Sequence, residues 1–308
     1  MNTPTITWIS ADEVYSRVSF GDAVAAYHRD LTAGVDPSKD LPKHIDDLTN
    51  GQVLLMPTQN SEFLGVKVVT VAPANPDKGL ERIQGHYLLF DTATLSPLAI
   101  MDGVALTTLR TPAVSAAAAD LLAAETCEHL VIFGYGPQAW GHVEALRAVR
   151  DITRVTLVGR NRERAQVMAD RITANGIPAT VGTADNVKDS NLIVCATTAR
   201  EPLFDGSLVA DDACVIAVGS HETDARELDT ALIARSQVIV EDLGHVMIEG
   251  GDIVMPINEG AITLDHVSTI RDLVIGAVKV DRDRPRVFKS SGMPWEDLVV
   301  AAEVYRRG

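Results

Sequence analysis

The sequence has few cysteines and no long apolar stretch. Cys127, Cys195 and Cys214 are odd in number and lie in or beside apolar runs, which favours buried free thiols over metal ligands or a catalytic nucleophile. We therefore expect no metal site. No apolar run reaches the roughly 18 to 20 residues that span a bilayer, and the polar start MNTPTITWISADEV lacks the basic and apolar regions of a signal peptide. These absences predict a cytoplasmic protein with no membrane partner.

The sequence also lacks an excess of positive charge. Its 27 Lys and Arg residues face 42 Asp and Glu residues, and the formal net charge of −15 is spread along the chain. This charge argues against nucleic acid as a partner and favours a small-molecule ligand. The 46% of hydrophobic and 22% of charged residues are typical of a folded globular protein, and 308 residues favour two domains over one.

Two patterns of apolar runs divide the chain. A helix expected over residues 11–34 is followed by the strand-like runs QVLLMPT, FLGVKVVTVA, IQGHYLLFD and SPLAIMDG, which indicate an α+β unit. From His129 onward, short apolar runs alternate with amphipathic helices, which is typical of an α/β, Rossmann-type, doubly wound parallel sheet. We predict a substrate-binding and dimerisation domain at residues 1–115, joined by residues 285–308, and a dinucleotide-binding domain at residues 116–284.

Two further helices are expected from local signals. In TPAVSAAAADLLAAE, Thr111 can cap a helix and Pro112 suits its first position, so this helix is expected to bridge the domains. The last segment, from about residue 261 to residue 308, is expected to be helical and ends in PWEDLVVAAEVYRR.

The turn in VIFGYGPQAWGH matches the fingerprint of a dinucleotide-binding site. Gly134 allows a tight turn out of the strand, Gly136 lets the backbone approach a pyrophosphate, and Ala139 replaces the third glycine of the motif. The amino end of the following helix then faces the phosphates. Because the turn stands between a strand and a helix, we predict nucleotide binding; the alternative is a purely structural turn.

The end of the second strand indicates which nucleotide is bound. An acidic residue there would bind the ribose hydroxyls of NAD, but TLVGRNRERA offers Arg160, Asn161 and Arg162. Guanidinium groups suit the 2′-phosphate of NADP, and no carboxylate repels it. We therefore favour NADP(H) over NAD(H); the alternative is a pair of solvated arginines at a helix start.

Three segments carry a resemblance to a known family. The glutamine and histidine of GYGPQAWGHVEAL, with TTLRTPAVSA upstream and SSGMPWEDL near the end, make the chain resemble the ornithine cyclodeaminase/μ-crystallin family over nearly its whole length. The resemblance implies a homodimer with a Rossmann domain and a separate substrate and dimerisation domain. It also implies hydride transfer between a nicotinamide and the α-carbon of a small amino or imino acid substrate.

The resemblance implies an active-site lysine at Lys67 and a carboxylate-binding arginine at Arg110. Lys67 lies in an apolar strand pattern, where a buried lysine has a lowered pKa suited to proton transfer; the alternative is an outward-pointing lysine on an edge strand. Arg110 directly precedes the expected proline-started helix, so its guanidinium and free helix N–H groups are expected to converge on one carboxylate. The alternative for Arg110 is an interdomain salt bridge.

The resemblance assigns further residues to substrate and cofactor. Lys43, followed by His44, stands near the place of a second carboxylate-binding arginine in many members, and Met56 is expected to line the substrate pocket unless it is a core methionine. The remaining positions that border the cofactor in the family are Thr111, Gln138, Cys195, Ala196, Thr197, Gly219, His221 and Gly292.

One departure from the family decides between its reactions. True cyclodeaminases carry an aspartate two residues after the equivalent of Gly219, where this chain has His221. Asp224 is nearby and could substitute for it, but it does not match position for position. The leading hypothesis is therefore an NADP(H)-dependent reductase of cyclic ketimines or imino acids, or a related amino-acid dehydrogenase. The alternatives are an ornithine cyclodeaminase, which forms proline and ammonia, and a nucleotide-binding protein with little catalysis.

Overall fold

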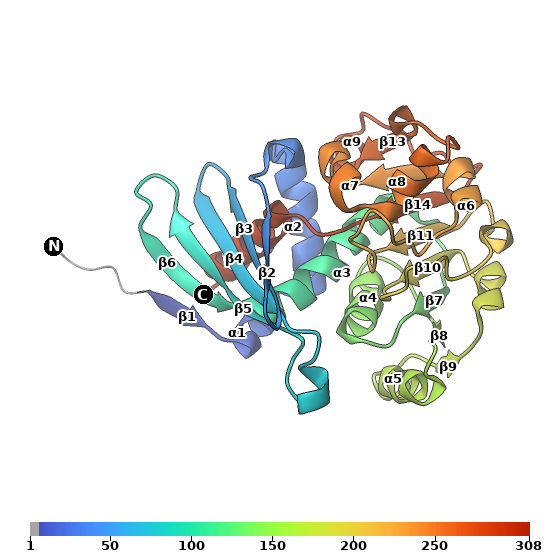
Figure 1. The fold of residues 1–308 in the computed structure, drawn as a ribbon, viewed down its shortest axis with the longest axis horizontal. Coiled ribbons are helices and arrows are strands. Elements are labelled where there is room, and N and C mark those ends of the chain that lie inside the picture. The colour runs from blue at the N-terminus through green and yellow to red at the C-terminus, as the bar shows by residue number, and fades with distance from the viewer. Residues whose placement is uncertain (1–5) are drawn as a thin grey trace. The chain divides into compact units, whose positions relative to one another are not determined.

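The computed structural model describes residues 6–308, which form two compact units (Figure 1). The first unit ends at Thr111 and resumes at Met293, and the second comprises Pro112–Gly292. The sequence-based division placed these two boundaries after residues 115 and 284.

A six-stranded sheet forms the centre of the first unit, in the order β1-β6-β5-β4-β3-β2. β1 is parallel to β6 and the other neighbours are antiparallel. The strands are β1 (Thr7–Ile9), β2 (His44–Leu48), β3 (Gly51–Gln59), β4 (Phe63–Val71), β5 (Ile83–Asp91) and β6 (Pro97–Asp102). The helices are α1 (Ala11–Arg17), α2 (Phe20–Ala33), the short 3₁₀ turns η1 (Pro37–Lys39) and η2 (Pro76–Lys78), and α10 (Pro294–Arg306). The four predicted strand runs are confirmed as β3, β4, β5 and β6.

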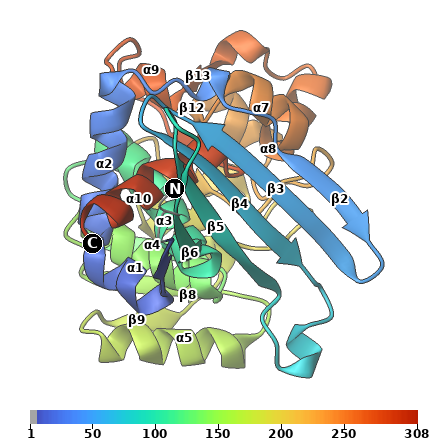
Figure 2. The same cartoon turned by 90° about the vertical axis from the view of Figure 1, so that its left-hand side faces the viewer.

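Helix α10 comes from the far end of the sequence and packs against α2, β3 and β4 (Figure 2). Every residue of α10 from Pro294 to Val304 is buried. The helix therefore completes the core of the first unit.

The single helix expected over residues 11–34 is wrong, because the chain forms α1 and α2 there. α1 ends before Val18, which has extended backbone angles. Ser19 then caps α2: its hydroxyl accepts the Asp22 N–H at 3.2 Å, and the Asp22 carboxylate accepts the Ser19 N–H at 3.0 Å. This reciprocal capping box starts a new helix.

The bridging helix also begins earlier than expected. α3 spans Gly103–Leu122, and the Asp102 carboxylate caps it by accepting the N–H groups of Val104 at 3.0 Å and Ala105 at 2.8 Å. Pro112 lies inside the helix, so the expected start at Thr111 and Pro112 is wrong. Arg110 is consequently a mid-helix residue, and the prediction that free helix N–H groups join it at a carboxylate is wrong as well.

The second unit contains a parallel sheet of eight strands in the order β13-β12-β14-β11-β10-β7-β8-β9. The strands are β7 (His129–Phe133), β8 (Arg154–Val158), β9 (Ala179–Val181), β10 (Leu192–Cys195), β11 (Cys214–Ala217), β12 (Gln237–Val240), β13 (Val267–Thr269) and β14 (Arg286–Lys289). The helices are α4 (Pro137–Arg147), α5 (Arg162–Ala174), η3 (Ala184–Asp189), η4 (Gly206–Leu208), α6 (Thr230–Arg235), α7 (Leu243–Glu249), α8 (Gly251–Asn258), η5 (Leu264–His266) and α9 (Ile270–Val274). The predicted Rossmann-type fold is confirmed.

The expectation of an all-helical segment over residues 261–308 is wrong. β14 lies in the middle of the sheet, between β11 and β12. Its sequence, RVFK, begins and ends with a charged residue, so the apolar run is too short to predict a strand. All four residues are nevertheless buried. The Arg286 guanidinium is satisfied by main-chain carbonyl groups, donating to Leu122 at 3.0 Å and to Asp212 at 2.6 Å.

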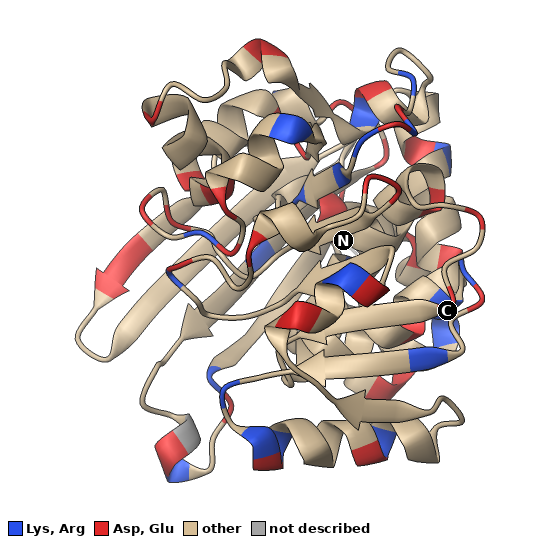
Figure 3. Cartoon of the chain, turned by 90° about the vertical axis from the view of Figure 1, so that its right-hand side faces the viewer, with Lys and Arg blue, Asp and Glu red and all other residues tan. Residues whose placement is uncertain are grey.

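Acidic and basic residues are interspersed along the helices and loops and are not gathered in one segment (Figure 3). Several charged side chains are buried, and most of these lie in the two clusters described below.

Candidate active site and nucleotide site

Lys67 lies in the interior of the first unit. It is on β4, an inner strand, and it stands between Met56 of β3 and Tyr87 of β5, with Met101 of β6 continuing the row. All four side chains are buried, and neighbours in such a row point to the same face of a sheet. The alternative of an outward-pointing lysine on an edge strand is therefore wrong. Met56 is a core residue beside Lys67, and its role in a substrate pocket stays a prediction.

Two carboxylates at the start of α10 balance the charges of Lys67 and Arg110. Lys67 Nζ lies 2.9 Å from Asp297 Oδ1 and 2.8 Å from Asp297 Oδ2. Arg110 Nη1 lies 2.5 Å from Glu296 Oε2, and Arg110 Nε lies 3.0 Å from Asp297 Oδ1. Both carboxylates are completely buried in the first turn of α10, where the helix dipole favours negative charge. The salt bridge of Arg110 thus lies inside one unit and is not an interdomain contact.

The environment of Lys67 changes its proton affinity. Burial lowers the pKa of Lys67, the Arg110 charge lowers it further, and the Asp297 carboxylate opposes both effects, leaving a value of about 8. A lysine with this pKa exchanges a proton near neutral pH, as general acid–base catalysis requires.

Asp40 extends the cluster on the same unit. Its Oδ2 accepts the N–H of Trp295 at 2.7 Å, which ties the loop after α2 to the first turn of α10. Burial raises the pKa of Asp40 to about 6, and the nearby Asp297 charge contributes to the shift. Tyr87 leans over Gly65, where a Cβ would lie 1.8 Å from the phenol oxygen. Burial raises the pKa of Tyr87 well above its usual value, so its phenol stays protonated.

Lys43 precedes β2, where His44 pairs with Leu55 of β3. Lys43 is half-buried and His44 is exposed. Because Met56 follows Leu55 on β3, the ladder brings the chain at Lys43 beside the row that contains Met56 and Lys67.

The glycine turn of the second unit has the geometry expected of it. Gly134 has a φ of +117°, and a Cβ there would lie 2.5 Å from the carbonyl oxygen of Ala196. Gly136 precedes α4, no side chain caps the helix, and a Cβ on Gly136 would meet nothing within 4 Å. Ala139 is completely buried. Gln138 Oε1 is buried and has no hydrogen-bond partner within the described part of the chain. An open, uncapped helix start is suited to phosphate oxygens.

The order of the strands defines where a ligand of this sheet binds. The chain proceeds from β7 to β8 and β9 on one side and from β10 to β11 on the other, so the switch point lies between β7 and β10. Ligands of such sheets bind outside the carboxyl ends of the strands at this point. Gly134 follows β7 there, and Ala196 follows β10.

Arg160, Asn161 and Arg162, which follow Gly159 after β8, are exposed. Asn161 caps α5 by accepting the N–H of Arg164 at 2.9 Å, while Arg160 and Arg162 flank it. Capping explains Asn161 without a ligand, and the phosphate-binding role of the two arginines stays a prediction.

The remaining predicted cofactor residues lie at strand ends or at the unit boundary. Cys195 is the last residue of β10 and is buried, as are Cys127 and Cys214, so the expectation of buried free thiols is confirmed. Ala196 and Thr197 follow it, and Gly219 follows β11 with the exposed His221 two residues later. The other two are Thr111 inside α3 and Gly292 after β14.

Asp224 does not replace the missing aspartate in this structure. Its side chain is 76% exposed and forms an ion pair of 2.7 Å with Arg200, which also binds Glu222. These contacts hold Asp224 on the surface.

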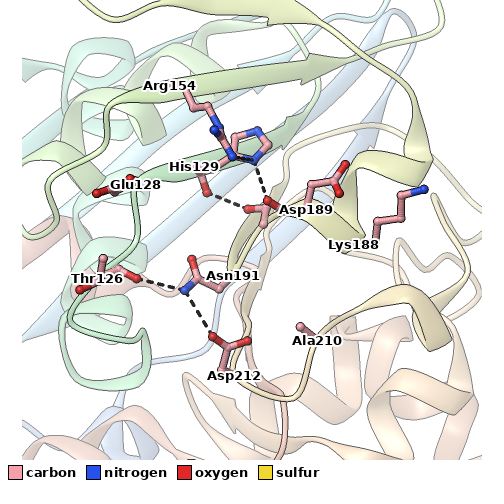
Figure 4. Close-up of a pocket in the computed structure, with 10 residues that line it drawn as sticks. Thr126, Glu128, His129, Arg154, Lys188, Asp189, Asn191, Ala210 and Asp212 are labelled. Carbon is pink, nitrogen blue, oxygen red and sulfur yellow. Dashed lines mark hydrogen bonds between the residues drawn. The ribbon is translucent and has the colours of Figure 1, made fainter.

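The second unit also has a hollow of about 340 Å³ at the amino ends of its strands (Figure 4). Its polar groups bind one another: His129 Nδ1 lies 2.9 Å from the Asp189 carbonyl oxygen, and Asn191 donates to the Thr126 carbonyl oxygen at 3.0 Å. Because the hollow is at the amino ends of the strands and the glycine turn follows the carboxyl end of β7, the two lie at opposite edges of the sheet.

Residues 6–308 contain neither a candidate metal site nor a candidate membrane span. No group of three or more His, Cys, Asp or Glu residues is placed to hold a metal ion. No helix in that range is long and apolar enough to cross a membrane.

Sequence reasoning missed the acidic partners of the predicted cations. Glu296 and Asp297 were visible in the segment PWEDL, and a buried lysine beside a buried arginine requires nearby carboxylates. Asp40 carried no comparable signal, because its contact depends on how the loop after α2 meets α10.

Together these features define a class of protein in which a Rossmann-type unit is combined with an α+β unit that buries two cations against two carboxylates. The chain belongs to the ornithine cyclodeaminase/mu-crystallin family, whose model matches residues 11–308.

Three relatives are similar over nearly the whole chain. The Delta(1)-pyrroline-2-carboxylate reductase of Colwellia psychrerythraea is 32% identical over 97% of this chain and 98% of its own length. The reductase of that name from Thermococcus litoralis, solved with NADH and L-proline, is 30% identical, with a TM-score of 0.91 over 98% of this chain and 97% of its own. An archaeal alanine dehydrogenase dimer with bound NAD is 27% identical, with a TM-score of 0.91 over 98% and 95% of the two chains.

Replacing Asp40 by Asn should make stability less dependent on pH. The pKa of Asp40 is raised from 3.8 to about 6 on folding, so its contribution to stability is complete below 3.8 and is lost as pH rises through about 6. Relative to the unaltered protein, Asp40→Asn should therefore gain about 1 to 3 kcal/mol of unfolding free energy between about pH 4 and about pH 8. Urea unfolding at several pH values measures this difference.

Asp22→Asn is the matched control with the opposite sign. Hydrogen bonds from Ser19 lower the pKa of Asp22, so its stabilising contribution is present above 3.8 and is lost on acidification. A pH-independent difference between Asp40→Asn and the unaltered protein would contradict the assignment for Asp40.

Proposed function

We propose that the protein is an NADP(H)-dependent reductase of cyclic imino acids such as Δ1-pyrroline-2-carboxylate. The observation that carries the proposal is the buried Lys67, with a pKa of about 8, held by Asp297 beside Arg110. This arrangement provides a proton donor next to a guanidinium that suits a substrate carboxylate.

The substrate class follows from the charges and from the relatives. A guanidinium has five N–H donors in a planar fork, so Arg110 can hold Glu296, Asp297 and a substrate carboxylate at once. Lys43 would add a second positive charge. The two reductases described above are named for Δ1-pyrroline-2-carboxylate, and one of them was solved with L-proline.

In the proposed reaction the C=N bond of the imino acid becomes a single bond. The carbon gains a hydride with its two electrons, and the nitrogen gains a proton. A bound nicotinamide would supply the hydride. Lys67 would supply the proton from Nζ, while Asp297 holds Nζ in position and stabilises its charged form. Water then returns a proton to Lys67.

Three features support a dinucleotide in the second unit. The uncapped start of α4 leaves its first N–H groups for phosphate oxygens, and the open space over Gly136 admits them. Arg160 and Arg162 follow the end of β8, where the adenosine ribose of a dinucleotide is expected, and no acidic residue stands directly after β8. We therefore favour NADP(H), although the similar Thermococcus protein was solved with NADH.

We also propose that the protein forms a homodimer through the first unit. Large apolar side chains of this unit are exposed, among them Trp8, Ile45, Leu48, Leu55 and Ile83. A second copy would cover such a surface, and the similar alanine dehydrogenase is a dimer.

The substrate assignment predicts consumption of NADPH when Δ1-pyrroline-2-carboxylate is added, with proline as the product. Steady-state absorbance and amino-acid analysis measure both. Ornithine with catalytic NADP⁺ is the control, and we expect no ammonia from it, because His221 lacks the fixed negative charge of the cyclodeaminase aspartate. Ammonia with proline and no net nicotinamide change would establish a cyclodeaminase. Binding of NADPH without turnover would favour a binding protein.

The cofactor assignment predicts tighter binding of NADPH than of NADH. Replacing Arg160 and Arg162 by Ala should weaken NADPH binding about ten- to a hundredfold and leave NADH binding nearly unchanged, because only the 2′-phosphate contact is lost. Fluorescence titration of both nucleotides measures the change. Arg154→Ala, on the amino end of β8, is a control for general loss of positive charge. Equal affinity of the unaltered protein for both nucleotides would contradict the assignment.

The proton-donor role predicts a decline of kcat for imine reduction as pH rises through about 8, the pKa of Lys67. Lys67→Arg keeps the positive charge beside Asp297 but does not release a proton, so kcat should fall by about a hundred- to ten-thousandfold. Nucleotide affinity and the unfolding midpoint serve as controls and should change little. Wild-type kcat in Lys67→Arg would exclude Lys67 as the donor.

A further inference from the structure

A second buried ionic cluster lies in the second unit and has no part in the proposed proton transfer. At its centre is Glu227, which is completely buried. Its Oε1 accepts the Thr197 N–H at 2.8 Å and the Thr197 hydroxyl at 2.7 Å, and its Oε2 accepts the Gly219 N–H at 2.7 Å. One carboxylate thus fixes the peptides that follow β10 and β11.

Asp252 and Lys289 complete the cluster. Asp252 Oδ1 accepts the N–H groups of Glu227 at 2.7 Å and Leu228 at 2.9 Å, and Asp252 Oδ2 lies 3.1 Å from Lys289 Nζ. Lys289 also donates to the Ser220 carbonyl oxygen at 2.5 Å. Since both side chains of the ion pair are completely buried, this contact is shielded from solvent.

Space around Gly219 shows how closely the carboxylate approaches the strand ends. A Cβ on Gly219 would lie 2.0 Å from the Thr197 carbonyl oxygen and 2.5 Å from Glu227 Oε1. The peptides after β10 and β11 therefore pack directly on each other and on Glu227, and a side chain at residue 219 would separate them.

The cluster binds the carboxyl ends of β10 and β11, in the half of the sheet that would receive the nicotinamide. A dinucleotide bridges the two halves of a Rossmann sheet, with its adenosine ribose at the end of the second strand. Here the second strand is β8, so the nicotinamide half belongs at the carboxyl ends of β10 and β11. Thr197 and Gly219 occupy those ends.

The cluster holds two carboxylates and one ammonium. Burial raises the pKa of Glu227, and the Asp252 charge adds to this rise, while Lys289 and the hydrogen bonds from Thr197 and Gly219 oppose it. Both oxygens of Glu227 accept hydrogen bonds from N–H groups, which favours the ionised form. The Ala199 N–H donates to Thr197 Oγ1, which directs the Thr197 hydroxyl proton toward Glu227.

We propose that Glu227, backed by Asp252 and Lys289, is a positioning residue for the nicotinamide end of the cofactor, and that the excess negative charge of this cluster favours the oxidised, cationic ring over the reduced, neutral one. The proposal rests on the proposed function. The negative charge of the cluster would make hydride donation easier, because positive charge develops on the nicotinamide ring as the hydride leaves the ring.

The test is the ratio of two dissociation constants, Kd for NADP⁺ divided by Kd for NADPH, measured by titration without substrate. Glu227→Gln removes the negative charge and should raise this ratio by about three- to tenfold. Asp252→Asn removes the other carboxylate and should change the ratio in the same direction, which keeps the proposal testable if Glu227→Gln does not fold. A purely structural role would raise both constants equally.

Two variants separate charge from position. Glu227→Asp keeps the charge but is too short to reach both Thr197 and Gly219, so both constants should rise while their ratio stays near that of the unaltered protein. Asp229→Asn, two residues along, changes a carboxylate that accepts the Gly206 and Leu232 N–H groups, and it should leave the ratio unchanged.

The outcomes distinguish the two proposals. If the unaltered protein binds both nucleotides and the ratio is unchanged in Glu227→Gln and Asp252→Asn, the inference about charge is overturned and the proposed function stands. An equal shift in Asp229→Asn would also overturn it. If the unaltered protein binds neither NADP(H) nor NAD(H), the proposed function and the inference both fail.

Discussion

The neutralisation of Lys67 and Arg110 by Glu296 and Asp297 is the constraint on which the first unit depends. A buried cation without a partner costs several kcal/mol, and β4 and α3 place two cations in the same interior. The compensating charges come from residues more than 180 positions later in the chain. Helix α10 must therefore return to the first unit, and its register must place two consecutive carboxylates over β4. The same requirement leaves a lysine with a lowered pKa beside a fixed carboxylate, so the contact that permits folding also prepares a proton donor.

Much of the fold could be predicted because local patterns agreed with the tertiary structure. β7 to β12, α4 and α5 follow directly from apolar runs that alternate with amphipathic helices. The failures occurred where a tertiary contact overrides the local signal. Asp102 starts α3 well before Pro112, although a proline usually marks a helix start. β14 was not predicted because its two charged ends are satisfied by distant groups. Carbonyl groups bind Arg286 and Asp252 binds Lys289, and no local sequence pattern indicates these contacts.

The candidate site was predictable in its cations and not in its anions. Lys67 stood out as a charge in an apolar strand pattern, and the glycines of the turn stood out by their spacing. The carboxylates Asp297, Asp252 and Glu227 look like ordinary acidic residues of helices and loops, because what distinguishes them is burial against distant groups. The arginines after β8 differ from these carboxylates because they are exposed and have no buried partner among residues 6–308 that would explain them. Their exposure agrees both with phosphate binding and with simple solvation, and only a ligand distinguishes the two.

The position of β14 has a consequence for the order in which the chain acquires structure during synthesis. β14 separates β11 from β12, so β12 and β13 cannot join the rest of their sheet before residues 286–289 have left the ribosome. Until then Lys67 and Arg110 also lack the carboxylates of α10. Nascent chains that stop short of this point therefore carry two unfinished cores, one in each unit, and not a finished domain with a trailing segment. Both units are completed nearly together by the same late stretch of chain.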